Sequence, residues 1–388
     1  MKRKLLLGAV SVAIGTLMAS TMSLAAENGV FKDRIVFGQS AAFGGPAAAL
    51  GKGMRTGIAV AFKEANDGGG VNGRKLEVIG YDDGYEPEKS IANVKKLIDV
   101  DQVFALIGAV GTPTSKATQP IATAAGVPFI GPFTGAGFLR KPENSNVVNV
   151  RATYGQETEA WIEYLTTEKG FDRIAILYQD DSFGRVGLAG VKKAMAKRGL
   201  KLVAEGTYKR NTVAVKSGLL KIRKGKPQAV VMVGAYKPCA AFIKLAKKAR
   251  LKATFVNISF VGSKALAKEL GKDGEGVIIS QVVPFPWNTA TPLVQQYQAA
   301  LKSFDPKAEP GFVTLEGYMV GRLVVKALGN IKREITRKGL TDMIAQMGAI
   351  DLGGVILTYG KGDNQGMDKV FLTQIQADGS FKSVKPAS

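Results

Sequence analysis

The chain has 388 residues, 46% of them hydrophobic and 22% charged, and its 53 lysines and arginines outnumber 32 aspartates and glutamates to give a net charge of +21 at pH 7. It contains no histidine and a single cysteine, Cys239. These counts exclude an intramolecular disulfide, nucleophile activation by histidine and the commonest zinc ligand sets.

The first residues have the pattern of a secretory signal peptide. Lys2, Arg3 and Lys4 precede an uncharged stretch from Leu5 to Ala26, which has small residues near its end. This order predicts a signal peptide over residues 1–25 and export to the periplasm. The remaining length of about 360 residues suggests two domains.

The first third of the chain alternates strand-like apolar runs with helical stripes. This alternation predicts a parallel sheet with helices on both faces. Residues 68–73 match G-x-G-x-x-G, but they follow a helix and precede a strand, so we interpret them as a turn and expect no nucleotide cofactor. The expected strands are 35–37, 76–81, 104–107 and 127–130, and the expected helices are 50–62, 91–98 and 114–125.

Small and hydroxyl-bearing residues follow the last two of these strands. They form the loops Gly108–Pro113 and Gly131–Gly135, and Thr114 or Ser115 is expected to cap the helix between the strands. The carboxyl ends of parallel strands are where ligands bind in open α/β sheets, and helix N-termini there favour anions. The two loops therefore form the predicted binding edge.

The same alternation repeats from Tyr154 to Val283 and predicts a second doubly wound sheet. Two helices and two late strands follow, so we expect the chain to return to the first domain after Val283 and to cross again near Gly360. The predicted fold is α/β, with two doubly wound parallel-sheet lobes joined by a multi-strand hinge and a binding cleft between them. The first lobe comprises residues 33–153 and 284–360, and the second comprises residues 154–283 and 361–385.

The positive charge does not indicate a nucleic-acid site. No acidic residue occurs between Glu205 and Glu269, but the lysines of this stretch are interleaved with apolar residues in helical patterns. Such patterns are typical of solvated helix faces, and no aromatic-basic motif for stacking bases accompanies them. We therefore expect no nucleic-acid partner.

Several short motifs, in this order and spacing, resemble those of one protein family. The chain resembles the periplasmic branched-chain amino-acid-binding proteins, the type I solute-binding components of ABC importers, from about Arg34 to Ala377. The motifs are Gly45-Pro46, Tyr81-Asp82-Asp83 with Pro87, Ile107-Gly108, Val127 to Pro132, Phe183-Gly184 and Gly234 to Tyr236.

The resemblance implies a ligand site residue by residue. Thr112 matches the family's hydroxyl residue that binds the ligand carboxylate, and Thr134 and Gly135 match the loop that binds carboxylate and amine. Phe183 and Tyr236 match the aromatic lid of the second lobe. The candidate ligand-binding residues are Gly111, Thr112, Phe133, Thr134, Gly135, Tyr154, Phe183, Tyr236 and Glu316, and Leu50 and Phe312 match side-chain pocket positions.

Two departures from the family pattern concern the ligand's ammonium group. Ser259 stands where the family's amino-acid binders have an acid, and Tyr85 and Gly111 replace a cysteine pair. Glu316 is one candidate for the missing charge, and Asp180 or Asp181 is another. The expected ligand is a branched-chain or other amino acid, and the alternative left open is an organic acid or amide without an ammonium group.

The resemblance also implies partners and excludes catalysis. The expected partners are a small-molecule ligand and the membrane permease of an ABC importer, and the protein is expected to be a monomer. We find no G-x-S-x-G elbow, P-loop or carboxylate-rich short motif, so we expect neither an enzyme nor a metal site. A ligand-sensing receptor that signals to a membrane partner is the alternative role.

Overall fold

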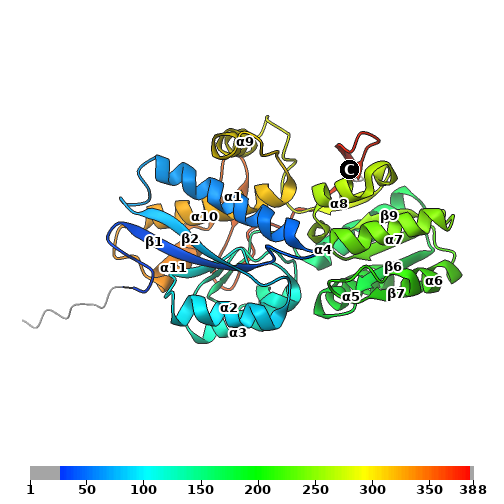
Figure 1. The fold of residues 1–388 in the computed structure, drawn as a ribbon, viewed down its shortest axis with the longest axis horizontal. Helices are drawn as coiled ribbons and strands as arrows, with labels where there is room; N and C mark the ends of the chain where they lie inside the picture. The colour runs from blue at the N-terminus through cyan, green and yellow to red at the C-terminus, as the bar shows by residue number, and fades with distance from the viewer. Residues whose placement is uncertain (1–26, 385–388) are drawn as a thin grey trace, which may run out of the picture.

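A computed structural model describes residues 27–384, and the predicted signal peptide lies outside the described residues. Two α/β lobes lie side by side, each built around its own sheet (Figure 1). Within residues 27–384, none of the helices combines the length and apolar character that crossing a bilayer requires.

The first lobe contains a five-stranded parallel sheet in the order β2-β1-β3-β4-β5. Its strands are β1 Arg34–Ala41, β2 Lys75–Asp82, β3 Ala105–Ile107, β4 Phe129–Ile130 and β5 Val147–Val148. Its helices are α1 Ala48–Asp67, α2 Pro87–Asp99, α3 Thr112–Ala124, α9 Pro292–Phe304, α10 Phe312–Asn330 and α11 Arg337–Met347, with a 3-10 turn, η1, at Gly137–Arg140.

Alternation along β1 explains why helices cover both faces of this sheet. Val36 packs in one apolar cluster with Leu97 of α2, whereas Phe37 packs in the other cluster, with Phe62 of α1 and with Phe104. Successive strand residues point to opposite faces, so both faces must be covered by apolar helix stripes. Figure 1 shows α1 and α10 on one face and α2 and α3 on the other.

The second lobe contains a seven-stranded sheet in the order β14-β13-β10-β9-β8-β6-β7, in which β13 and β14 run antiparallel to their neighbours. Its strands are β6 Ile174–Gln179, β7 Ala204–Tyr208, β8 Ala229–Val233, β9 Thr254–Asn257, β10 Ile278–Gln281, β13 Phe371–Ile375 and β14 Phe381–Val384. Its helical elements are α4 Tyr154–Glu163, η2 Tyr164–Glu168, α5 Ser182–Ala196, α6 Lys216–Lys224, α7 Tyr236–Lys248, η3 Ser259–Val261, α8 Ser263–Leu270 and η4 Gly271–Gly274.

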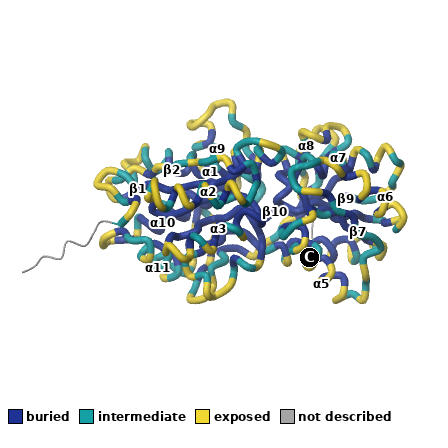
Figure 2. The backbone as a smooth tube through the Cα atoms, turned by 60° about the horizontal axis from the view of Figure 1, so that its bottom comes forward, coloured by how far each residue is buried: buried dark blue, intermediate teal, exposed yellow. Residues whose placement is uncertain are grey.

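The chain passes between the two sheets after β5, after β10 and before β13. The predicted fold class, two doubly wound lobes, is confirmed; the lobe boundaries stated above remain a proposal. Apolar side chains of both lobes belong to one continuous buried cluster. Figure 2 shows the buried residues concentrated in the strands and in the segments where the lobes meet.

Two features of the first lobe differ from the sequence-based expectation. The late strand expected at residues 354–358 is β12, Ile356–Thr358, which pairs only with β11, Ala349–Asp351, in a separate two-stranded sheet. Helix α11 was not predicted, because only Leu340 and Ile344 of its residues are buried and two positions make a weak periodic signal.

Helices α1 and α10 approach so closely that glycines are required at their contact. A Cβ added at Gly57 would meet the carbonyl oxygen of Thr314, and one added at Gly317 would meet the carbonyl oxygen of Met54. Both obstacles are backbone atoms, which cannot move without shifting a helix. This contact holds the base of α10, which carries Glu316, at a fixed distance from the sheet.

We therefore expect Gly317→Ala to lower the free energy of unfolding by about 1–3 kcal/mol through overpacking. Gly329→Ala is the matched control in the same helix, because a Cβ there meets nothing within 4 Å. That variant should be neutral or up to about 1 kcal/mol more stable. Urea unfolding followed by circular dichroism measures both, and equal effects of the two variants would contradict the packing argument.

Candidate functional site

A pair of threonine hydroxyls stands where the loops after β3 and β4 meet. The loops pair through a parallel bridge between Val110 and Phe133, and the Gly111 N–H donates to the Phe133 carbonyl at 3.2 Å. This pairing brings Thr112 Oγ1 within 2.7 Å of Thr134 Oγ1. The two loops of the predicted binding edge therefore meet at a pair of threonine side chains, and both threonines are fully buried.

Helix α3 begins two residues earlier than expected. Thr112 is its first residue and Gly111 occupies the cap position, so the prediction that Thr114 or Ser115 caps the helix is wrong. The Thr114 hydroxyl instead donates back to the carbonyls of Val110 and Gly111. Because N–H groups in a first helical turn have no intrahelical acceptor, the threonine pair lies beside free donors and a positive helix end.

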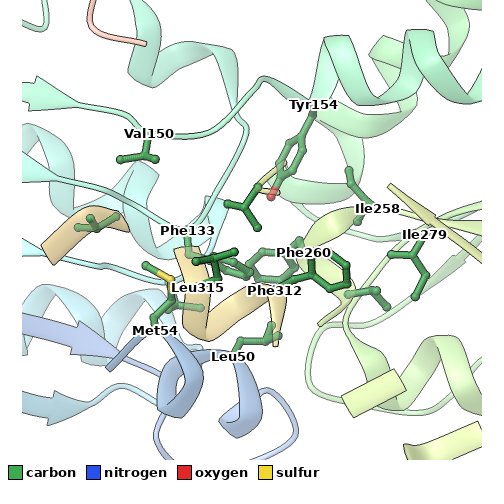
Figure 3. Close-up of a cluster of buried hydrophobic side chains, with 14 of the residues drawn as sticks. Leu50, Met54, Phe133, Val150, Tyr154, Ile258, Phe260, Ile279, Phe312 and Leu315 are labelled. Carbon is green, nitrogen blue, oxygen red and sulfur yellow. The ribbon is translucent and has the colours of Figure 1, made fainter. Parts of the chain in front are cut away.

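Aromatic rings of the second lobe cover the threonine pair. Phe183 of α5 lies 5.4 Å from Tyr154 and 4.6 Å from Phe260, measured between ring centroids. The Phe260 ring also lies 5.4 Å from Phe133 and 5.7 Å from Tyr85, both of the first lobe. Figure 3 shows Tyr154, Phe133 and Phe260 converging from different segments. Phe260 is thus the centre of the aromatic cluster, although sequence reasoning did not select it.

Two glycines make room for these rings. Gly111 has φ +102°, and a Cβ there would overlap the Tyr85 ring. A Cβ on Gly135 would lie 2.6 Å from Cδ1 of Tyr154, whose N–H donates to the Gly135 carbonyl at 2.8 Å. Both glycines therefore contribute by letting an aromatic side chain approach the loop backbone.

Tyr85 is held in the left-handed region at φ 63°, a conformation that costs free energy for a bulky residue. The buried carboxylate of Asp83 stabilises it by accepting the Tyr85 N–H at 2.8 Å, while the hydroxyls of Ser40 and Ser90 donate to the same carboxylate. The Tyr85 hydroxyl accepts from Gln179 of the second lobe at 3.3 Å. The strained residue therefore contributes one of the contacts between lobes.

Further polar contacts close the lobes on each other. Tyr236, the first residue of α7, accepts the Ala49 N–H at 3.4 Å through its hydroxyl. Glu86 accepts from Arg210 and from Asn211, each at 2.7 Å. The described arrangement is therefore a closed one, in which solvent does not reach Thr112, Thr134, Tyr154 or Phe183.

A cluster of buried charges lies beside the aromatic rings. Arg151 Nε is 3.4 Å from Glu316 Oε1, the guanidinium lies 4.6 Å from the Phe133 ring centroid, and its Nη2 donates to the Ser259 hydroxyl. Ser259 in turn donates to Glu157 through its N–H at 2.9 Å and its hydroxyl at 2.8 Å. Arg151 thus forms a buried ion pair with Glu316.

Burial shifts the pKa values of Glu316 and Arg140, whereas the pKa of Arg151 is raised, despite its burial, by the charges of Glu316, Tyr154 and Glu157. Loss of solvent raises the pKa of Glu316 to about 7, although the positive charge of Arg151 acts in the opposite direction. Loss of solvent likewise lowers the pKa of Arg140 to about 9, and Arg151 adds to that effect. Arg140 donates to the carbonyls of Thr134 and Arg151, both at 3.1 Å, and so fixes the loop that carries the threonine pair.

Every acid considered as an ammonium partner already has a partner in this structure. Asp180 pairs with Arg185 at 2.7 Å. Asp181 accepts the Phe183 N–H at 2.9 Å, capping α5, and also binds Arg210 at 3.0 Å. With Glu316 beside Arg151, none of these candidate carboxylates is without a partner. Residues 27–384 contain no group of three or more acidic, cysteine or histidine side chains placed to hold a metal.

Two buried hydroxyls near the threonine pair lack partners. Within residues 27–384, neither Tyr154 Oη nor Ser115 Oγ has a hydrogen-bond partner. Buried polar atoms are nearly always bonded, so an unpaired hydroxyl in a cleft is a contact available to a ligand. Sequence reasoning did not select Ser115 for this role.

Sequence reasoning also missed Glu157. An acid in the first turn of a helix is ordinarily explained by the helix dipole, so its position in α4 gave no signal of a buried cluster. Phe260 follows Ser259, which was selected for a departure from the family pattern, and examining that neighbour could have found it.

The chain is similar to known proteins over most of its length. A family model described as periplasmic binding protein matches residues 34–380. A solved structure titled a possible leucine/isoleucine/valine-binding protein, from Rhodopirellula baltica, is 38% identical with a TM-score of 0.88, covering 93% of this chain and 98% of that chain. The Leu/Ile/Val-binding protein homolog 7 of Brucella abortus is 23% identical over 337 residues, 83% of this chain and 82% of the relative. The leucine-, isoleucine-, valine-, threonine-, and alanine-binding protein of Pseudomonas aeruginosa is 24% identical, over 73% and 75% of the two chains.

The raised pKa of Glu316 predicts a pH-dependent stability. Because the folded-state value of about 7 exceeds the ordinary value of 4.5, this group's contribution is fully present below pH 4.5 and is lost as the pH rises towards 7. Relative to Glu316→Gln, the wild-type free energy of unfolding should fall by about 2–3 kcal/mol between pH 5 and pH 8. Urea unfolding of both proteins at the two pH values measures this, and a difference that does not change with pH would contradict it.

Proposed function

The chain belongs to the periplasmic binding protein family, and from this premise we propose that it captures a small carboxylate-bearing solute between its lobes and delivers it to the membrane permease of an ABC importer. The family and the fold are those of solute-binding proteins and not of enzymes. We further propose that the protein works as a monomer in the periplasm, where the predicted signal peptide would direct it.

The observation that carries the proposal is the buried pair of threonine hydroxyls at the start of α3. Thr112 Oγ1 and Thr134 Oγ1 lie 2.7 Å apart beside the N-terminus of a helix of 13 residues. Two hydroxyl donors and free helical N–H groups form a suitable receptor for the two oxygens of one carboxylate. Tyr154 Oη supplies a further unpaired group at the same point.

Closure of the lobes explains how binding would be reported to a permease. The rings of Phe183 and Tyr236 belong to the second lobe, whereas the threonine pair belongs to the first. A solute that contacts both stabilises the closed arrangement by the contacts that the open one lacks. A receptor that signals to a membrane partner would use the same closure and differ only in that partner.

The ligand class follows from the partners of the acids. The names of the relatives support an amino acid. Ser259, however, supplies no charge at the position of the family's acid, and Glu316 is only 3% exposed and bound to Arg151. Burying an ammonium group without a carboxylate partner costs free energy, so the geometry favours an organic acid without an amine over an amino acid.

We expect Thr112→Val to weaken ligand binding tenfold to a hundredfold, because a hydrogen bond to a charged group contributes about 1.5–3 kcal/mol. Thr118→Val is the matched control, since Thr118 is also buried on α3 but its hydroxyl donates to the Thr114 carbonyl. Titration calorimetry would use a carboxylate found by a thermal-shift screen. Equal affinities in the two variants would place the site elsewhere.

The ligand class is tested by molecules that differ only in the amine. We expect 4-methylpentanoate to bind at least tenfold more tightly than leucine, and 3-phenylpropanoate more tightly than phenylalanine, because the cleft lacks an uncommitted acid. Thermal shifts at matched concentrations rank each pair, since a ligand at 100 times its Kd adds about 2.7 kcal/mol. Tighter binding of the amino acids would instead favour an amino-acid ligand.

A further inference from the structure

A surface cavity of about 960 Å³ lies beside the segments that connect the two lobes. We call it the hinge hollow. Residues from 283–291, 354–358, 367–373 and 381–383, together with Phe312, line it. None of the nine candidate ligand-binding residues is among them, but Phe312 also matches a side-chain pocket position of the family, so the hinge hollow adjoins the predicted site at Phe312. Its volume lies within the range of small-molecule pockets, about 300–1,000 Å³.

Aromatic rings from both lobes form one wall of the hinge hollow. The Phe312 ring, at the start of α10, lies 5.8 Å from Phe381 of β14 and 5.9 Å from Phe285 of the connecting segment. Trp287 stacks on Phe381 at 5.6 Å but is not itself a lining residue. Among the lining rings Phe312 is buried and Phe371 of β13 is 36% exposed, so solvent reaches part of this apolar wall, and such surfaces commonly mark binding sites.

The charges of the hinge hollow all have one sign. Its only charged lining residues are Lys369 and Lys382, and within residues 27–384 neither lysine belongs to an ion pair. Ser383 stands opposite Thr373 in the β13–β14 register and also lines the hollow, whereas the Thr373 hydroxyl is already bonded to Ile279 and Gln281. Alternation along β14 directs the Lys382 side chain to the other face from Phe381 and Ser383. An apolar wall with Lys369 and the Ser383 hydroxyl at its polar side is complementary to an amphipathic anion.

We propose that the hinge hollow binds an alkyl carboxylate, with its apolar chain against Phe312 and Phe381 and its carboxylate at Lys369. The long apolar wall favours an extended tail over a compact polar metabolite, and the absence of an acidic lining residue favours a negative head group. Because the wall joins α10 to β14, the occupant stabilises the closed arrangement; this consequence rests on the proposed function, whereas the binding itself does not.

The test is titration calorimetry of the full mature chain with decanoate, below its critical micelle concentration, and with decan-1-ol as the uncharged probe. We expect decanoate to bind more tightly than decan-1-ol. Ser383→Trp, which places a large side chain in the hollow, should weaken decanoate binding tenfold or more. Lys369→Glu should weaken it at least threefold without changing decan-1-ol binding, whereas Lys382→Glu, on the other face of β14, should leave both affinities unchanged.

Controls separate this site from the cleft. Lys272→Glu changes the net charge by the same amount as Lys369→Glu at an exposed lysine outside the hinge hollow and should leave decanoate affinity unchanged. Thr112→Val should also leave it unchanged. Decanoate binding that is lost in Thr112→Val but retained in Ser383→Trp would overturn the proposal, and so would the absence of decanoate binding to a protein that still binds its cleft ligand.

Discussion

The buried guanidinium of Arg151 is the interaction on which the closed arrangement depends. It lies on the first passage between the lobes, pairs with Glu316 of α10, and reaches Glu157 of α4 through Ser259. Burial raises the pKa of Glu316 to about 7, so this contact is an ion pair only above that pH, while the guanidinium also donates to Ser259. One side chain therefore contacts both lobes and lies on the segment that connects them.

The same interaction determines what the cleft can recognise. With Glu316 beside Arg151, the polar groups left to a solute are the hydroxyls of Thr112, Thr134 and Tyr154, the N–H groups at the start of α3, and Nε and Nη1 of Arg151, which have no hydrogen-bond partner within residues 27–384. The remaining surface is aromatic. Such a site is selective for a negative oxygen pair on an apolar body, because hydroxyls and helix N-termini stabilise anions while rings replace water around the rest of the solute.

Local pattern was sufficient to predict the sheets and the loops of Thr112 and Thr134, because neighbouring parallel strands bring their carboxyl ends together whatever the rest of the chain does. The pairing of Arg151 with Glu316 could not be predicted, since it exists only after the chain has returned to the first lobe. Phe260 lies in a short 3-10 turn, where no periodicity distinguishes a cleft residue from a core residue.

The most direct measurement is a crystal structure of the protein with the carboxylate that a screen identifies. The account predicts that both carboxylate oxygens lie within hydrogen-bonding distance of Thr112 Oγ1, Thr134 Oγ1 or the first N–H groups of α3, with Phe183 and Tyr236 over the apolar part and the Arg151–Glu316 pair intact. A carboxylate bound to Arg151 with Glu316 displaced, or a ligand found outside the cleft, would contradict it.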